Sequence, residues 1–261
     1  AHLVAREYGS DALVLLLPAD HHIRDVDGFH EAIEAAAELA AAGSIITFGV
    51  QPTGPETGYG YIERGARLGQ GYLVKRFTEK PDREAAQQFI ENGAYYWNAG
   101  IFLFGSGAVL SEMNRHCPEI ANASLRALEQ ASNEGDQVNL CAESFSSCPS
   151  NSFDYAVMEK TDKAVVVPAD IGWSDIGAWQ ALWEIADDKT ADGNVARGDV
   201  HFVETRNSYV MSTGPRVGVV GVQNVVIVVT DDAVLVSDAG RSQDVKALVE
   251  ALKEEGRTDL L

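Results

Sequence analysis

As far as Gly193, short and continuous apolar runs alternate with segments of helical periodicity. The runs at 12–17 and 44–50 show no polar alternation, which is typical of strands buried on both faces of a parallel sheet. Between them, the apolar positions of "DVDGFHEAIEAAAELAAAG" repeat at helical spacing, with Asp25 or Asp27 available to cap the helix and Gly43 to end it. The order strand, helix, strand predicts a right-handed βαβ unit.

The same patterns place further elements along this part of the chain. An N-terminal amphipathic helix is expected to end at Gly9, and Asp82 and Gly93 are typical of the start and the end of another helix. Strands are predicted at 72–79, 99–105 and 164–168, two helical segments within 109–134 that break at Pro118, and a short amphipathic helix at 178–186.

Beyond Gly193 the pattern changes to short β-branched runs. They are "VHFVE", "SYVMS", "VGVVGV", "VVIVVT" and "AVLVS", and a last helix is predicted at 243–255. Their regular spacing is typical of a small coiled β-structure or of the edge of a sandwich. We therefore expect an α/β domain at 1–193 and a β-rich segment with a final helix at 194–261.

Composition narrows the classes of partner. With 39 acidic against 20 basic residues the formal charge is −19, whereas nucleic-acid binding requires a basic face. No apolar run approaches the roughly 18 residues of a membrane span, so neither nucleic acid nor membrane is expected. The three cysteines are odd in number and form no C-x-x-C pair, which favours free thiols in a reducing cytoplasm.

Two aspartates follow predicted strands. Asp20 comes after the run at 12–17, where ligands bind in open α/β sheets, but it could equally cap the next helix or pair with His21 or His22. Asp175, in "GWSDIGAW", also follows a strand, and the alternative for it is a helix N-cap.

Four further residues have chemistry suited to binding a ligand. In "RFTEKPD", the ammonium of Lys80 suits a phosphate and the carboxylate of Glu79 suits hydroxyl groups, although a surface ion pair explains them as well. In "PETGYGYIE", Gly60 allows a ligand to approach the backbone N–H, or simply makes a turn. Asn98, among aromatics in "YYWNAGIF", either binds a ligand hydroxyl or satisfies a backbone group.

Taken together, these residues suit a polyphosphate bound with Mg²⁺. The ion is typically held by one or two carboxylates, with phosphate oxygens and waters completing its shell. The sequence shows no EF-hand spacing, zinc cluster, Ser-His-Asp order or nucleophile elbow, so a covalent mechanism has little support.

The motifs "LPADH", "TGYGYI", "EKP", "YYWNAGIFLF", "SFDYAVMEK" and "GWSDIGAW", in this order, resemble those of mannose-1-phosphate guanylyltransferases. The resemblance is to the nucleotidyltransferase half of the bacterial enzymes that also carry a mannose-6-phosphate isomerase domain. It implies a Rossmann-like sugar-nucleotidyltransferase fold followed by a left-handed β-helix-like segment. It also implies a cytoplasmic enzyme of polysaccharide biosynthesis that converts mannose 1-phosphate and GTP to GDP-mannose and pyrophosphate.

The resemblance also implies roles for individual residues. Asp20 and Asp175 would bind Mg²⁺ and, with Lys80, would be catalytic. The substrate-binding set would be Gly60 through its N–H, Glu79 and Asn98 on mannose hydroxyls, and Lys80 on the sugar phosphate, with Asp154 and Glu159 supporting the pocket. The sugar phosphate would attack the α-phosphorus of GTP in line, without an enzyme nucleophile.

The sequence departs from the family at one point. The glycine-rich signature G-G-x-G-x-R-L-x-P with its downstream lysine, and the segment that would hold guanine, are absent. We therefore expect a chain whose N-terminal part is missing, which could be inactive. Two alternatives stay open: a non-catalytic fragment that binds sugar phosphate, and a transferase for another sugar 1-phosphate and nucleotide. The C-terminal β-segment offers a surface for a homodimer.

Overall fold

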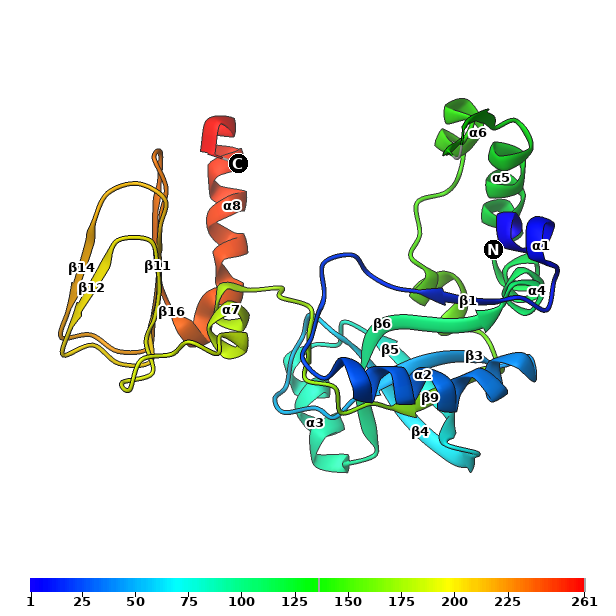
Figure 1. Ribbon diagram of the computed structural model, residues 1–261, viewed down its shortest axis with the longest axis horizontal. Helices are drawn as coiled ribbons and strands as arrows, with labels where there is room; N and C mark the ends of the chain where they lie inside the picture. The colour runs from blue at the N-terminus through cyan, green and yellow to red at the C-terminus, as the bar shows by residue number, and fades with distance from the viewer. Residues whose placement is uncertain (136, 261) are drawn as a thin grey trace. The chain divides into compact units, whose positions relative to one another are not determined.

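The computed structural model describes residues 1–135 and 137–260, and the chain forms two compact units, Ala1–Trp173 and Ser174–Leu261 (Figure 1). This division lies earlier than the boundary expected at Gly193. The reason is the short helix α7 (Trp179–Ile185), because its Trp179 and Leu182 pack on the core of the second unit.

The first unit is built on a mixed six-stranded sheet. Its order is β1-β6-β3-β9-β5-β4; β3 and β9 are parallel, and the other neighbouring pairs are antiparallel. Since β1 and β3 both run antiparallel to β6, they are parallel to each other with β6 between them. The strands are β1 (Leu13–Leu16), β3 (Ile45–Val50), β4 (Gly60–Leu68), β5 (Gly71–Glu79), β6 (Tyr95–Gly105) and β9 (Ala164–Pro168).

The expectation for the first apolar run is wrong. Instead of lying buried in a parallel sheet, β1 is an edge strand whose partner among the described residues is the antiparallel β6. Leu13 and Leu16 are 38% and 46% exposed. A run of apolar residues indicates that the side chains are favourable to bury. It does not indicate which strand will pair with the run.

Helices cover both faces of this sheet (Figure 1). On one face, α2 (Val26–Ala41) buries Phe29 against Phe48 of β3, and Asp25 caps the helix by accepting from Gly28 N at 2.9 Å. On the other face, α4 (Ser106–His116) and the five-residue π-helical turn η1 (Asp154–Met158) pack on Ile45. Successive residues of β3, such as Ile45 and Ile46, thus belong to the cores on opposite faces of the sheet, because side chains alternate along a strand.

The other helices of the first unit follow their local signals. Asp82 caps α3 by accepting from Ala85 N at 2.8 Å, and Gly93 ends it with φ 70°, as predicted. Pro118 begins α5, also as predicted. These helices are α1 (His2–Tyr8), α3 (Arg83–Asn92), α5 (Pro118–Glu129) and α6 (Ala142–Ser146), and the remaining short strands are β2 (His22–Ile23), β7 (Ser132–Glu134), β8 (Gln137–Asn139) and β10 (Trp173–Ser174).

The second unit is a small β-helix-like coil followed by helices. Strands β11, β13 and β15 stack in parallel on one side and β12 and β14 on another, and β16 ends the first stack antiparallel to β15. Its elements are β11 (Val195–Arg197), β12 (Val200–Val203), β13 (Tyr209–Ser212), β14 (Val217–Val220), β15 (Val225–Val229), β16 (Val234–Asp238), η2 (Ala239–Asp244), α8 (Val245–Glu254) and η3 (Thr258–Leu260). The β-rich coil and the final helix agree with the sequence patterns.

No helix in the described residues has the length and apolar character needed to cross a lipid bilayer. The cysteines Cys117, Cys141 and Cys148 are free thiols.

Candidate functional site

Three strands bring Gly60, Glu79 and Asn98 together. Gly60 begins β4 and lies opposite Glu79, the last residue of β5, while the next residue, Tyr61, pairs with Trp97 of β6. A Cβ built on Gly60 would lie 2.5 Å from Glu79 Oε2 and 3.2 Å from Asn98 Cβ. A side chain at position 60 would therefore collide with Glu79, and glycine lets the Glu79 carboxylate lie against β4. The sequence patterns gave no bounds for β4, the strand that brings Gly60 to the other two residues.

Lys80 places an ammonium group beside the Glu79 carboxylate. Its Nζ lies 3.0 Å from Glu79 Oε1, and the Lys80 side chain is 59% exposed whereas that of Glu79 is 9% exposed. The hydrogen bond from Lys80 to Glu79 raises the pKa of Lys80, so the group stays a cation. Lys80 also adopts φ 46°, an uncommon conformation for a residue with a side chain, and donates from its backbone N to Tyr59 O at 3.2 Å.

The ion pair offered as the structural alternative is thus present, but it is not an ordinary surface pair. Its carboxylate is nearly buried while its ammonium faces solvent. That arrangement leaves Lys80 accessible to an anion and keeps the Glu79 carboxylate beside it.

The side-chain amide of Asn98 is oriented by three neighbours. Its Oδ1 accepts from Thr47 Oγ1 at 2.8 Å and from Gly100 N at 3.2 Å, and its Nδ2 donates to Asp154 Oδ1 at 3.0 Å. Because both oxygen lone pairs have donors, one N–H of Nδ2 is the remaining hydrogen-bonding capacity of this group. Asn98 can therefore act on a ligand as a donor.

The turn η1 supplies two carboxylates to the site. Asp154 accepts from Asn98, and burial, followed by the nearby charge of Glu79, raises its pKa. Glu159, just after the turn, accepts from Glu79 N at 3.3 Å. Single turns of π-helix occur often at functional sites. The supporting role that the resemblance implied for both residues agrees with these contacts.

Asp20 lies in an exposed loop that is held against β6. His21 accepts at Nδ1 from Trp173 Nε1 at 3.1 Å, and a Cβ on Gly100 would lie 3.7 Å from His21 Cε1. Since Asp25 is the N-cap of α2, the capping alternative for Asp20 is wrong. The loop of Asp20 therefore lies against β6 at Gly100, two residues after Asn98.

Asp175 belongs to the second unit. Its Oδ1 accepts from Gly177 N at 2.9 Å, and the N-cap position of α7 is occupied by Ala178. The carboxylate thus holds the turn before the helix rather than capping it. Because Asp20 and Asp175 lie in different units, their sharing of one cation stays a prediction.

The carboxylates of Asp20 and Asp175 are ligands of the kind that suits a magnesium ion. Within the described parts of the chain, no three His, Cys, Asp or Glu residues are grouped as ligands for a metal. Magnesium, however, usually takes only one or two carboxylates and completes its shell with water and phosphate oxygens. The exposed carboxylate of Asp20 fits such a ligand set.

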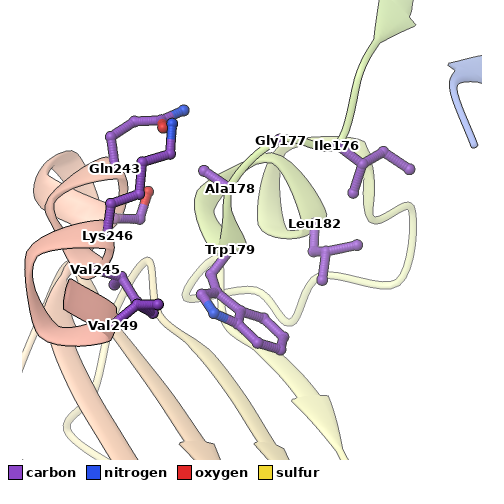
Figure 2. A pocket seen from close by; sticks show the side chains of 10 residues that line it. Ile176, Gly177, Ala178, Trp179, Leu182, Gln243, Val245, Lys246 and Val249 are labelled. Carbon is purple, nitrogen blue, oxygen red and sulfur yellow. The ribbon is translucent and has the colours of Figure 1, made fainter. Parts of the chain in front are cut away.

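A cavity of about 310 Å³ lies within the second unit, between the start of α7 and the segment η2–α8 (Figure 2). Trp179, Val245 and Val249 form much of its wall, with Gln243 and Lys246 as polar neighbours. None of the predicted sugar-binding residues lines this cavity; they are Gly60, Glu79, Lys80 and Asn98.

Sequence reasoning missed Thr47, which orients Asn98. The sequence holds a signal for it, since Thr47 is a polar residue within the apolar run "IITFGV", and the structure shows that its side chain is fully buried. Asp154 was noticed in the motif "SFDYAVMEK". Its partner Asn98, 56 positions earlier, could not be predicted from the sequence.

Comparison with known proteins gives consistent matches over the whole chain. The nucleotidyl transferase family matches residues 1–192, and the "MannoseP isomerase/GMP-like beta-helix domain" matches residues 198–252. A mannose-1-phosphate guanylyltransferase of Klebsiella pneumoniae is 46% identical over 99% of this chain and 56% of its own length. The alginate biosynthesis protein AlgA of Pseudomonas syringae is 44% identical over 96% of this chain and 52% of its own.

A crystal structure agrees with these matches. The structure described as a mannose-1-phosphate geranyltransferase from Thermus thermophilus superposes with a TM-score of 0.81 at 33% identity, covering 97% of this chain and 72% of that one. The present chain spans just over half the length of the curated relatives. The sheet, the β-helix-like coil and these matches agree: the chain belongs to the nucleotidyl transferase family, in the branch that carries the mannose-phosphate type of β-helix domain.

Proposed function

We propose that this chain is the nucleotidyltransferase part of a mannose-1-phosphate guanylyltransferase. The substrates would be mannose 1-phosphate and GTP, and the products GDP-mannose and pyrophosphate. The observation that carries the proposal is the exposed ammonium of Lys80 beside the sheltered carboxylate of Glu79 and the oriented amide of Asn98. The names of the curated relatives support the choice of substrates.

Each group has one task in sugar binding. Glu79, a carboxylate, accepts a hydrogen bond from a mannose hydroxyl, and the remaining N–H of Asn98 donates to a hydroxyl oxygen. Gly60 offers its backbone N–H to the sugar, and Lys80 binds the phosphate as a point charge. The site can therefore bind hydroxyl groups and a phosphate at the same time, and a sugar 1-phosphate carries both.

The reaction needs positioning more than it needs covalent chemistry. An oxygen of the sugar phosphate attacks the α-phosphorus of GTP, a new P–O bond forms, and the bond to the oxygen bridging to the β-phosphate breaks. Pyrophosphate leaves with that electron pair. Lys80 orients the attacking phosphate and offsets its charge, while Glu79 and Asn98 fix the sugar.

Mg²⁺ is the proposed cofactor, with Asp20 and Asp175 as its carboxylate ligands. When bound, it would supply charge neutralisation at the phosphate oxygens. Asp20 is exposed, and Asp175 holds the turn before α7 by accepting from Gly177 N.

The setting of the protein is part of the proposal. Three free thiols fit the reducing cytoplasm, where disulfides are rare. A homodimer formed through the C-terminal β-segment is also proposed.

The test uses the product of the full reading frame that carries this sequence. Pyrophosphate release is followed with Mg²⁺, GTP and mannose 1-phosphate, and then with glucose 1-phosphate or other nucleoside triphosphates. Lys80→Ala should raise the KM for mannose 1-phosphate by roughly 10- to 100-fold, the worth of one hydrogen bond to a charged group. The KM for GTP should change little.

Lys75→Ala is the matched control, since Lys75 is an exposed lysine on β5, the strand that ends just before Lys80, and pairs with Glu63 instead. Turnover with another sugar only would support the alternative transferase. Binding of mannose 1-phosphate without turnover would support a non-catalytic binding protein. Equal increases in both KM values would show that Lys80 does not contact the sugar phosphate specifically.

A further inference from the structure

Outside the site, a buried carboxylate is surrounded by cationic and hydroxyl groups. Glu112 on α4 is 1% exposed, yet it accepts from Thr161 Oγ1 at 2.7 Å and lies 3.1 Å from Lys163 Nζ. His116 Nε2 is 3.3 Å away and Arg115 4.0 Å away. Burial by itself would raise the pKa of Glu112, but the hydrogen bonds from Thr161 and Lys163 outweigh it and lower that pKa.

A buried ionic cluster is a costly way to stabilise a fold. Well-packed apolar residues at such a place are often equally stabilising or better, whereas a charged cluster can specify one arrangement of the groups around it. What Glu112 holds in place therefore matters more than its contribution to stability.

Glu112 connects two of the chain segments that form the sugar site. It lies on α4, which follows directly from β6, the strand of Asn98. Thr161 follows closely after the turn η1 that carries Asp154, and its backbone N donates to Val157 O at 2.9 Å within that turn.

The same two segments thus meet twice. At the site, Asn98 Nδ2 donates to Asp154, and on α4 Glu112 accepts from Thr161. A second link beside Glu112 joins Arg115 to Asp162 at 3.2 Å. With one end of η1 fixed by Glu112 and the other by Asn98, the position of Asp154 is set from both sides.

We propose that Glu112 and Thr161 are positioning residues for the sugar pocket: their buried hydrogen bond holds η1 so that Asp154 orients the Asn98 amide and Glu159 holds Glu79. This inference rests on the proposed function. Neither residue touches substrate.

The test compares Thr161→Val with Thr161→Ser. Valine has the shape of threonine without the hydroxyl, while serine keeps the donor to Glu112. In calorimetric titrations we expect Thr161→Val to weaken mannose 1-phosphate binding by roughly 10-fold or more, because small misplacements in a site are costly. Thr161→Ser should bind within about 2-fold of the wild type, since it retains the hydrogen bond.

Ala36→Gly controls for lost stability alone. Ala36 is a fully buried residue of α2, which packs on the opposite face of the sheet from η1, so this variant should lower the melting temperature without changing affinity. Hydrogen exchange gives a readout that needs no ligand: the amides of Glu159 and Thr161, bonded within the turn, should exchange faster in Thr161→Val and unchanged in Ala36→Gly.

The outcomes distinguish failure of the positioning role from failure of the proposed function. Wild-type affinity or unchanged exchange in Thr161→Val would overturn the positioning role, and so would equal weakening in Thr161→Ser or Ala36→Gly. Absence of mannose 1-phosphate binding by the wild type would instead overturn the proposed function. The exchange rates would then still decide whether Glu112 and Thr161 hold η1.

Discussion

The amide nitrogen of Asn98 donates to Asp154 Oδ1 across 3.0 Å, and this bond joins a central strand to a π-helical turn 56 residues later. It leaves the amide one free N–H for a ligand, next to the carboxylate of Glu79 and the ammonium of Lys80. The proposed sugar site is therefore a product of tertiary contacts as much as of its motifs.

Gly60→Ala should close this site. The new Cβ would lie 2.5 Å from Glu79 Oε2, and that carboxylate, at the end of a flexible side chain, would have to move. We expect the fold to persist and the affinity for mannose 1-phosphate to fall roughly 10-fold or more, measured by titration calorimetry. Gly58→Ala is the matched control, because a Cβ there would meet nothing within 4 Å. Equal affinities in the two variants would exclude Gly60 from the site.

Thr47→Val should disturb the same amide from the other side. It removes the donor to Asn98 Oδ1, a bond between buried groups, at a cost of about 1 kcal/mol in stability. Binding of mannose 1-phosphate should weaken as well, because the amide is less firmly oriented. Thr47→Ser, which loses a methyl group but keeps the hydroxyl, should retain affinity. If serine and valine bind equally well, the hydroxyl of Thr47 has no role in binding.

Asp154→Asn should change how stability depends on pH. A raised pKa means that the folded protein holds this proton to higher pH than the unfolded chain does. Between the unfolded and the folded pKa of Asp154, the wild type therefore loses stability as pH rises. The asparagine variant lacks this contribution, so it should gain stability relative to the wild type through that window and keep the gain above it.

Urea unfolding of both proteins at several pH values from acid to neutral measures the difference. A difference in free energy of unfolding that does not vary with pH, or that changes in the opposite direction as pH rises, would contradict the direction of the Asp154 shift.

Asp175→Asn tests the metal proposal without disturbing the turn. Asparagine can still accept from Gly177 N, so the loop before α7 should keep its shape while the charge is lost. In the full-length protein we expect kcat to fall roughly 100-fold or more, since metal-based charge stabilisation is worth several kcal/mol. Circular dichroism and Asp199→Asn, at an exposed aspartate of the same unit, are the controls. Normal turnover at saturating Mg²⁺ would leave Asp175 only its structural role.

Local signals in the sequence were sufficient for features that depend on neighbouring residues. Asp25, Asp82 and Gly93 mark helix ends because capping involves residues three or four positions away. The motif residues Gly60, Glu79 and Asn98 were identified from the chain, and the structure brings them together.

Features set by distant partners could not be predicted in this way. The leucines of β1 looked central, but the partner of that strand, β6, begins some eighty positions later and runs antiparallel. Thr47, Asp154 and Glu112 bond across 51, 56 and 49 positions. No periodicity or capping rule reports such pairs, because they exist only once the sheet has formed.

The most direct measurement is a crystal structure of the protein with mannose 1-phosphate bound. The proposed function predicts the phosphate within salt-bridge distance of Lys80 Nζ, and the sugar hydroxyls on Glu79 and on the free N–H of Asn98, over Gly60. Mannose 1-phosphate bound elsewhere, for instance in the cavity between α7 and α8, with Lys80 still paired only to Glu79, would contradict it.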